Sequence, residues 1–211
     1  MMQPKPVGAC FWERMDDDAL VRHLAADLDG AFEALVLGHQ DRLFTISLRL
    51  LGDPEDAEEV AQDAFLRAYR ALAGWDHDRI SELRIRPWLA SVVVNLSRNR
   101  RRRQSDRRPP FRLGPLLSAG LQPAAEASRG PEAAGLRREE AERWAGQLLR
   151  CPPALRTAVV LRHVDGLSYD EIAGVLGRPV GTVKAQVHRG LARLRAELER
   201  EDTLQREELT A

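Results

Sequence analysis

Apolar residues recur at helical spacing through the first half of the chain, and polar residues fill the positions between them. A first inward-facing stripe consists of Phe32, Leu35, Val36, Leu43, Ile46 and Leu50. Gly52 ends that helix, and Asp53-Pro54 begins the next one, because aspartate is a favoured N-cap and proline fits the first helical position. The pattern is helical throughout residues 16–104, where we expect a first domain.

Two more helices follow from the same periodicity. The stripe of the second helix consists of Ala57, Val60, Ala61, Ala64, Phe65, Ala68 and Leu72. A polar loop runs from Gly74 to Arg86, and Pro87 begins a third helix. The inward positions of this third helix are Trp88, Leu89, Val92, Val93 and Leu96. Because no convincing strand pattern interrupts these stripes, the sequence predicts an all-α fold.

The pattern changes in kind after the third helix. Residues 105–135 contain five prolines and four glycines without a sustained hydrophobic period, which is typical of a flexible linker. Helical periodicity returns over residues 136–199, the second predicted domain. We expect a disordered N-terminus over residues 1–15 and a polar, frayed tail over residues 200–211. The prediction is therefore two small helical domains joined by a flexible linker.

The second domain carries the local signals of a helix-turn-helix. Ser168 and Glu171 form a capping box at the start of a short helix, and Gly177 ends it. The inward face of the next helix consists of Val183, Val187, Leu191, Leu194 and Leu198. Its other face carries Lys184, Gln186, His188 and Arg189, near the end where recognition helices meet base edges. The pattern predicts DNA binding; the competing interpretation is a core helix pair whose basic face is only solvated.

Charge is strongly segregated although the formal net charge of the 211 residues is zero. The segment from Asp53 to Asp63 has six acidic residues and no basic one. The segment from Arg98 to Arg108 has seven arginines and one aspartate. Such blocks indicate separate surfaces for separate partners, although a solvated face is the default interpretation of either block alone.

Several classes of chemistry are not indicated by the sequence. Cys10 and Cys151, the only cysteines, are too few for a disulfide framework or a zinc cluster, and their redox role is left open. Without a phosphate-binding glycine loop or a nucleophile motif, we expect no metal, no cofactor and no enzymatic activity. The N-terminus lacks the apolar core of a signal peptide, and no run approaches the ~18 apolar residues of a membrane span. We expect a cytoplasmic protein without membrane insertion.

Three segments resemble motifs of the sigma-70 family, specifically its extracytoplasmic-function (ECF) type. GDPEDAEEVAQDAFLRAYRAL (52–72) is similar to the RNA-polymerase-binding helix of that family, and PWLASVVVNLSRNRRRR (87–103) to its −10-reading helix. LSYDEIAGVLGRPVGTVKAQVHRGLARLR (167–195) is similar to its −35-reading motif. The resemblance implies a factor that binds bacterial core RNA polymerase, directs it to promoters through −10 and −35 elements, and promotes strand opening.

The resemblance also implies three sets of functional residues and three partners. The set that would dock on the β′ coiled coil of the polymerase is Asp56, Glu59, Gln62 and Asp63. The set that would hold the opened −10 strand is Asn95, Arg98, Arg100, Arg101 and Arg102. The set that would read the −35 major groove is Thr182, Lys184, Gln186, His188 and Arg189. The implied partners are core polymerase, through its β′ and β subunits, promoter DNA and an anti-sigma factor.

The chain departs from the family pattern in the loop before the third helix. Residues 75–87 form a loop several residues longer than the family pattern and lack the family's glycine, so the pocket for a flipped −10 base stays unassigned. Trp75 and Trp88 are candidates for base stacking, but both also fit core positions. The main alternative function is a helix-turn-helix regulator that binds duplex DNA without being a polymerase subunit. The acidic second helix and the asparagine and arginines of the third count against it.

Overall fold

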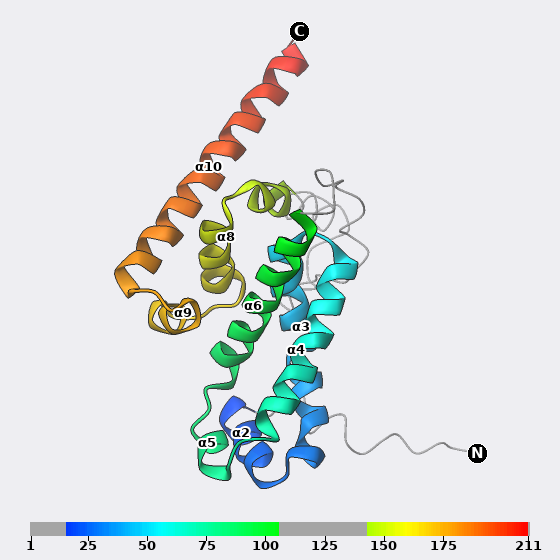
Figure 1. Ribbon diagram of the computed structural model, residues 1–211. Coiled ribbons are helices and arrows are strands. Elements are labelled where there is room, and N and C mark those ends of the chain that lie inside the picture. The colour runs from blue at the N-terminus through cyan, green and yellow to red at the C-terminus, as the bar shows by residue number, and fades with distance from the viewer. Residues whose placement is uncertain (1–15, 106–142, 211) are drawn as a thin grey trace, which may run out of the picture.

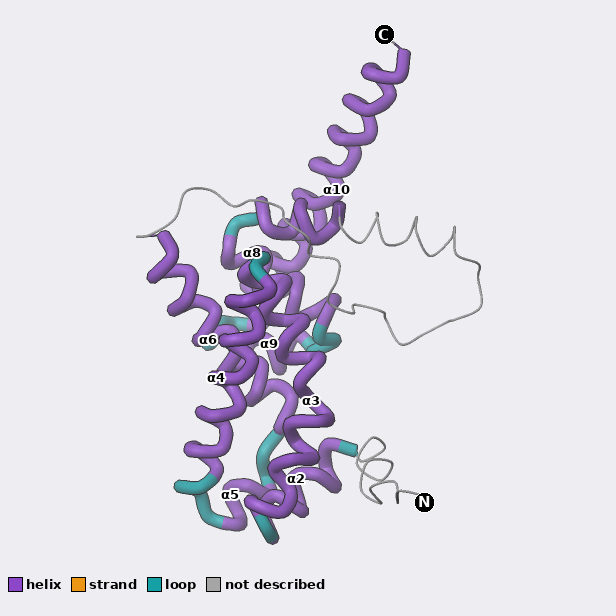
Figure 2. The backbone as a smooth tube through the Cα atoms, turned by 90° about the vertical axis from the view of Figure 1, so that its right-hand side faces the viewer, coloured by secondary structure: helices purple, strands orange, loops and turns teal. Residues whose placement is uncertain are grey.

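The computed structural model describes residues 16–105 and 143–210, and every regular element in these two ranges is a helix (Figures 1 and 2). The helices are α2 (Asp17–Ala26), α3 (Leu28–Leu51), α4 (Pro54–Leu72), α5 (His77–Ser81), α6 (Ile85–Ser105), α8 (Pro153–Val159), the π-helix η1 (Val160–Val164), α9 (Tyr169–Leu176) and α10 (Val180–Thr210), and residues 143–150 are also helical. The expected all-α fold is confirmed. The expected N-terminal segment and nearly all of the expected linker lie outside the described residues.

Side-chain caps fix where several helices begin. The Asp53 carboxylate accepts from the Asp56 amide at 3.0 Å, and Pro54 occupies the first turn of α4, as predicted. The capping box of α9 is complete, because Ser168 Oγ accepts from the Glu171 amide and Glu171 Oε2 accepts from the Ser168 amide. Gly52 ends α3 at φ +81°, a left-handed conformation that favours glycine.

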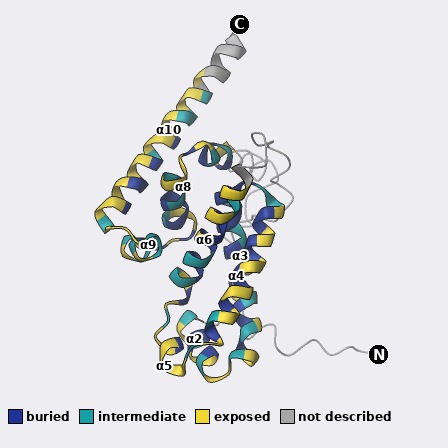
Figure 3. Ribbon diagram, viewed as in Figure 1, coloured by how far each residue is buried: buried dark blue, intermediate teal, exposed yellow. Residues whose placement is uncertain are grey.

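The core of the first domain lies between α3, α4 and α6, with α2 and α5 packed at one end (Figure 3). Leu35, Leu43 and Ile46 of α3 are almost completely buried. Ala64 and Ala68 of α4 are fully buried, and their small side chains let the neighbouring helices approach closely. The sequence missed α5, which lies inside the segment predicted to be a polar loop.

In the second domain α10 packs on α8 and α9. The contact with α8 is close at Gly190, where an added Cβ would lie 2.5 Å from Cγ2 of Val159. α10 continues without a break to Thr210 and projects beyond the other helices (Figure 1). Residues 200–210, which the sequence predicted to be a polar, frayed tail, belong to this helix and extend the recognition helix.

The two domains pack against each other, which the sequence did not predict. α9 lies on α6, and both η1 and α8 contact α3. Arg156 NH1 of α8 donates to the Leu50 carbonyl at 2.7 Å, close to the C-terminal end of α3. A Cβ added at Gly52 would lie 2.5 Å from Leu149, so the helix of residues 143–150 also reaches the first domain. The molecule is thus closed, with the second domain seated on α3 and α6.

Candidate nucleic-acid and polymerase interfaces

The outward face of α4 combines acidic and apolar residues. Glu59, Gln62 and Asp63, three of the four residues expected to bind polymerase, are exposed on this face. Leu66 and Tyr69 continue the face one and two turns further along, and their side chains are 56% and 38% exposed. These two residues were not predicted from the sequence, although their absence from the inward stripe was a usable signal. Large apolar side chains exposed beside carboxylates suit a protein partner.

Asp56, the fourth expected polymerase residue, is only 5% exposed. Arg100 of α6 contacts it with Nε at 2.7 Å and contacts Glu59 with NH1 at 2.7 Å. These hydrogen bonds, first to Asp56 and then to Glu59, raise the pKa of Arg100. The structure therefore joins one expected DNA-binding arginine to two expected polymerase-binding carboxylates. In this arrangement Asp56 lies within the α4–α6 contact.

The exposed residues of α6 form a polar face toward its C-terminal end. Asn95, Arg98 and Arg102 are exposed and share one side of the helix at spacings of three and four residues. Arg101 is half-buried, and burial lowers the pKa of its guanidinium, which stays cationic. Of the expected −10 set, Asn95, Arg98 and Arg102 thus have the most accessible placement.

On α10 the structure corrects one of the five expected −35 residues. Thr182, Lys184, His188 and Arg189 are exposed, as expected for a recognition face. Gln186 is 6% exposed, and its Oε1 has no hydrogen-bond partner. The physical reason is helical spacing, because position 186 lies on the inward stripe between Val183 and Gly190. The expectation that Gln186 lies on the outward face is wrong.

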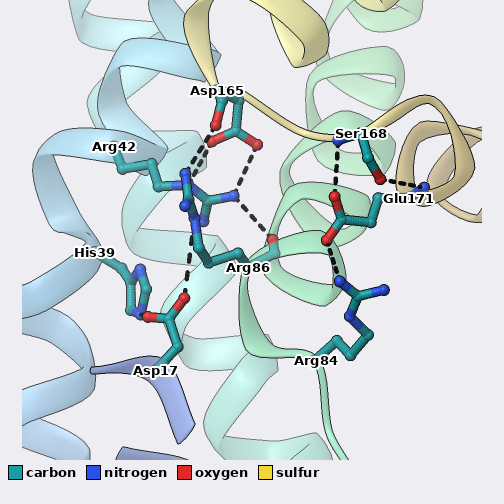
Figure 4. Close-up of polar contacts among 8 residues, drawn as sticks. All are labelled: Asp17, His39, Arg42, Arg84, Arg86, Asp165, Ser168 and Glu171. Atoms are coloured by element: carbon teal, nitrogen blue, oxygen red, sulfur yellow. Dashed lines mark hydrogen bonds and ion pairs between the residues drawn. The ribbon is translucent and has the colours of Figure 1, made fainter. Parts of the chain in front are cut away.

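A network of arginines and carboxylates joins the two domains (Figure 4). Arg42 of α3 binds both carboxylate oxygens of Asp165, with NH2 2.7 Å from Oδ2 and Nε hydrogen-bonded to Oδ1. The Asp165 side chain is completely buried. Arg86 NH2 donates to the Asp165 carbonyl at 2.8 Å, and Arg84 NH2 lies 2.6 Å from Glu171 Oε1. Two-point arginine–carboxylate contacts are among the stronger polar contacts in proteins.

His39 and Asp17 extend this network into the first domain (Figure 4). His39 Nε2 lies 3.6 Å from Asp17 Oδ1, and the imidazole is 4% exposed. Burial, together with the positive charges of Arg42 and Arg86, lowers the pKa of His39 to about 4. His39 is therefore neutral at physiological pH, and its buried Nδ1 has no hydrogen-bond partner. Burial raises the pKa of Asp17, although the neighbouring arginines oppose that effect.

Other chemistry is not indicated in the described parts of the chain. Residues 16–105 and 143–210 contain no group of three or more His, Cys, Asp or Glu side chains able to hold a metal ion. Cys151 is buried, and burial raises the pKa of its thiol, which opposes the formation of a reactive thiolate. Within the same ranges, no helix has the length and apolar character needed to cross a membrane.

Trp75 and Trp88 lie side by side, and Trp88 also lines a groove between α6 and α9. Their ring centroids are 5.3 Å apart, and both residues are partly buried against the core. The guanidinium of Arg79 lies 4.1 Å from the centroid of the Trp75 ring, a cation–π contact. The pair thus packs the loop between α4 and α6 against the core, at the core positions that the sequence also allowed.

Comparison with known proteins covers both domains. A family model for sigma-70 region 2 matches residues 35–107, and one for sigma-70 region 4 matches residues 147–194. The chain is 32% identical to the ECF RNA polymerase sigma factor SigW of Bacillus subtilis over 173 residues, which are 80% of this chain and 89% of SigW. It is 34% identical to the RNA polymerase sigma-H factor of Pseudomonas aeruginosa over 177 residues, 82% and 89% of the two chains.

The fold is also similar to solved structures. CnrH in complex with the cytosolic domain of CnrY matches with a TM-score of 0.61 at 26% identity, over 87% of this chain and 97% of CnrH. The sigma factor RpoE of Bartonella quintana, solved with the anti-sigma factor NepR, matches with a TM-score of 0.57 at 22% identity, over 80% and 96% of the two chains. Two region models in the family's order, together with relatives matched over most of their length, identify this chain as a member of the ECF type of the sigma-70 family.

Proposed function

We propose that this protein binds bacterial core RNA polymerase and directs it to promoters by reading a −10 element with α6 and a −35 element with α10. The observation that carries the proposal is the presence of two separate exposed basic helix faces in one chain, beside an exposed acidic face on α4. A regulator of duplex DNA needs only one of these faces. The protein acts as an initiation factor in the cytoplasm and is not itself an enzyme.

The α4 face is the proposed polymerase contact. Glu59, Gln62 and Asp63 supply polar groups for the β′ coiled coil, and Leu66 and Tyr69 supply apolar area beside them. The carboxylates speed the encounter and select the partner, whereas the apolar residues contribute more of the affinity. Asp56 supports this surface from within through its contact with Arg100.

The α6 face is the proposed −10 contact. Asn95 meets unpaired bases of the opened strand, and Arg98 and Arg102 hold its phosphates. Because unpaired bases become available only when the strands separate, binding the separated strand stabilises promoter opening without a nucleotide cofactor.

The exposed N-terminal part of α10 is the proposed −35 contact. Arg189 is suited to two-point recognition of a guanine in the major groove, and Lys184 and His188 flank it on the same surface. Gln186 has no part in this contact because it is buried.

An anti-sigma factor is a further proposed partner. The similar structure of CnrH contains the cytosolic domain of CnrY, and RpoE of Bartonella quintana was solved with the anti-sigma factor NepR. A partner of that class would hold this protein away from polymerase until a signal releases it.

The test is in vitro transcription with purified bacterial core polymerase and a library of promoter fragments. We expect initiation from a subset of fragments only when both core and this protein are present. The matched variant Asn95→Ala should still bind core but should lose strand opening, measured by permanganate reactivity of unpaired thymines. If the protein binds duplex fragments but neither binds core nor initiates transcription, the helix-turn-helix regulator becomes the better interpretation.

A further inference from the structure

One face of α6 and the residue just before it form a single strip that extends toward the second domain. Arg84, Trp88, Ser91, Asn95 and Arg98 follow one another at spacings of four, three, four and three residues, so they share one side of the helix. The C-terminal part of this strip, from Asn95 onward, is exposed and carries the proposed −10 contacts. The N-terminal part faces α9.

α9 covers the N-terminal part of the strip directly. One shallow groove between the two helices is lined by Arg84, Trp88 and Ser91 on one side and by Asp170 and Glu171 on the other. Figure 4 shows the Glu171 carboxylate turned toward the Arg84 guanidinium, which it contacts at 2.6 Å. The same side of α6 that carries Asn95 is thus occupied by the second domain.

Two carboxylates of the second domain bind arginines of the first domain next to this groove. Asp165 binds Arg42 through both of its oxygens, and Glu171 binds Arg84. Arg86 donates to the Asp165 carbonyl. A guanidinium donates to two oxygens of a phosphate in the same geometry as to two oxygens of a carboxylate. Asp165 thus presents two carboxylate oxygens to Arg42 and Glu171 presents one to Arg84, as a DNA phosphate would, and Arg86 lies beside them on the Asp165 backbone.

The closed arrangement is too short to span a promoter. α9 contacts both α6 and α10, and packed helix axes lie about 8–10 Å apart, so the two reading helices are separated by about 20 Å. Elements centred near −10 and −35 are separated by about 25 base pairs, or about 85 Å at 3.4 Å per base pair. The contact between α6 and α9 must therefore separate when both elements are bound.

We infer that Arg42, Arg84 and Arg86 are additional phosphate contacts for the −10 strand, and that Asp165 and Glu171 of the second domain occupy them in the closed molecule. The inference rests on the proposed function. Separation of the domains uncovers the rest of the α6 strip and releases the three arginines at the same time. The strand then runs from Arg98 and Asn95 toward the start of α6.

The test compares substitutions on the two sides of the same contacts. Asp165→Asn with Glu171→Gln removes both carboxylate charges, and glutamine keeps the capping box of α9. A second variant carries Arg84→Ala and Arg86→Ala in addition to these two substitutions. The controls are Asp41→Asn and Arg70→Ala, two exposed positions on α3 and α4. Circular dichroism checks folding, and the radius of gyration from small-angle X-ray scattering reports separation of the domains.

The probe is a fluorescent single-stranded 20-nucleotide DNA of random sequence, titrated by anisotropy over a series of salt concentrations. We expect the carboxylate variant to have a larger radius of gyration and about tenfold tighter binding than the unsubstituted protein, a typical coupling between two states. Adding the two arginine substitutions should keep the molecule open and reduce the salt slope of log K by about 1.4, since each phosphate contact on a single strand contributes about 0.7.

Two results would overturn the inference. An open carboxylate variant whose salt slope is unaffected by the arginine substitutions would mean that these arginines only hold the domains together. A carboxylate variant that binds DNA no more tightly than the control Asp41→Asn would mean that the second domain masks no phosphate site. If the double variant does not fold, Arg84→Ala alone, at a side chain that is 74% exposed, must still lower the salt slope in the Glu171→Gln background. Binding to core polymerase is measured in parallel, and its loss counts against the proposed function alone.

Discussion

The two helices proposed to read DNA differ in how much of their reading face is accessible. On α10, Lys184, His188 and Arg189 are exposed, and the helix packs on α8 and α9 through its opposite side. On α6, Arg84, Trp88 and Ser91 of the strip line the groove with α9, whereas Asn95 and Arg98 are exposed outside that groove. Both helices are basic, so tertiary packing and not composition makes the difference. The closed molecule is ready to read a duplex element with α10, but it must open before α6 is fully available.

The largest expected effect is a loss of unfolding free energy in acid, caused by the buried His39 of α3. His39 has a folded-state pKa of about 4 against 6.5 for an exposed histidine, so the folded state binds fewer protons between these values. The contribution of neutral His39 to the unfolding free energy is fully present above pH 6.5. About 3 kcal/mol of this contribution is lost as the pH falls from 6.5 through 4. Urea unfolding at pH 7.5 and pH 4.5 measures the change.

The control for this prediction is His39→Gln, which removes the titrating group. Its unfolding free energy should fall less between the two pH values than that of the unsubstituted protein. Asp17 acts in the opposite direction near its own range, because burial raises its pKa and protonation then favours the folded state. Equal losses in the two proteins would contradict the assignment of a buried neutral imidazole.

The next effect concerns the accessible face of α10. Arg189→Ala should weaken binding to a −35 duplex by about 1–3 kcal/mol, or roughly fivefold to 160-fold, because a two-point contact to guanine is lost. Core binding should not change, since the proposed polymerase face is on α4. A gel shift with promoter duplex and a pull-down with core polymerase measure the two properties. Unchanged duplex affinity would remove Arg189 from the reading face.

A smaller effect is expected where Arg100 joins α6 to α4. Arg100→Ala leaves the Asp56 carboxylate, which is 5% exposed, without this partner and should lower the unfolding free energy by about 1–2 kcal/mol. Combining it with Asp56→Asn gives a double-mutant cycle, and the two changes should be less than additive. Arg98→Ala, at an exposed position on the same helix, is the matched control and should leave stability within about 0.5 kcal/mol. Strict additivity would show that Arg100 does not hold Asp56.

The smallest effect tests the correction on α10. Gln186→Leu replaces a buried amide whose Oε1 is unpaired with an apolar side chain of similar size. We expect a change in stability of less than about 1 kcal/mol, toward greater stability, because the unpaired polar atom is removed. Promoter affinity should stay within twofold, measured by the same gel shift as for Arg189→Ala. A large loss of duplex binding would return Gln186 to the reading face.

Much of the fold could be predicted because it depends on local signals. The starts of α4 and α9 depend on caps within four residues, at Asp53 and at Ser168 with Glu171, and both were predicted. The four exposed residues of the expected −35 set could also be placed on the outward face from helical spacing. Gln186 was misplaced because its polar character suggested the outer face, whereas its spacing from Val183 puts it on the inner one.

The sequence by itself determined the longer helices that carry the proposed contacts, their order and the family, because caps, periodicity and motifs are properties of neighbouring residues. Only the tertiary structure decided which charges meet. Arg100 and Asp56 are 44 residues apart, and Arg42 and Asp165 are 123 residues apart. No sequence periodicity connects positions so far apart, and the sequence around each of these residues predicts only a solvated charged face. Whether a charge serves a partner or a neighbouring helix depends on the packing of the domains, which brings these pairs together and excludes water from them.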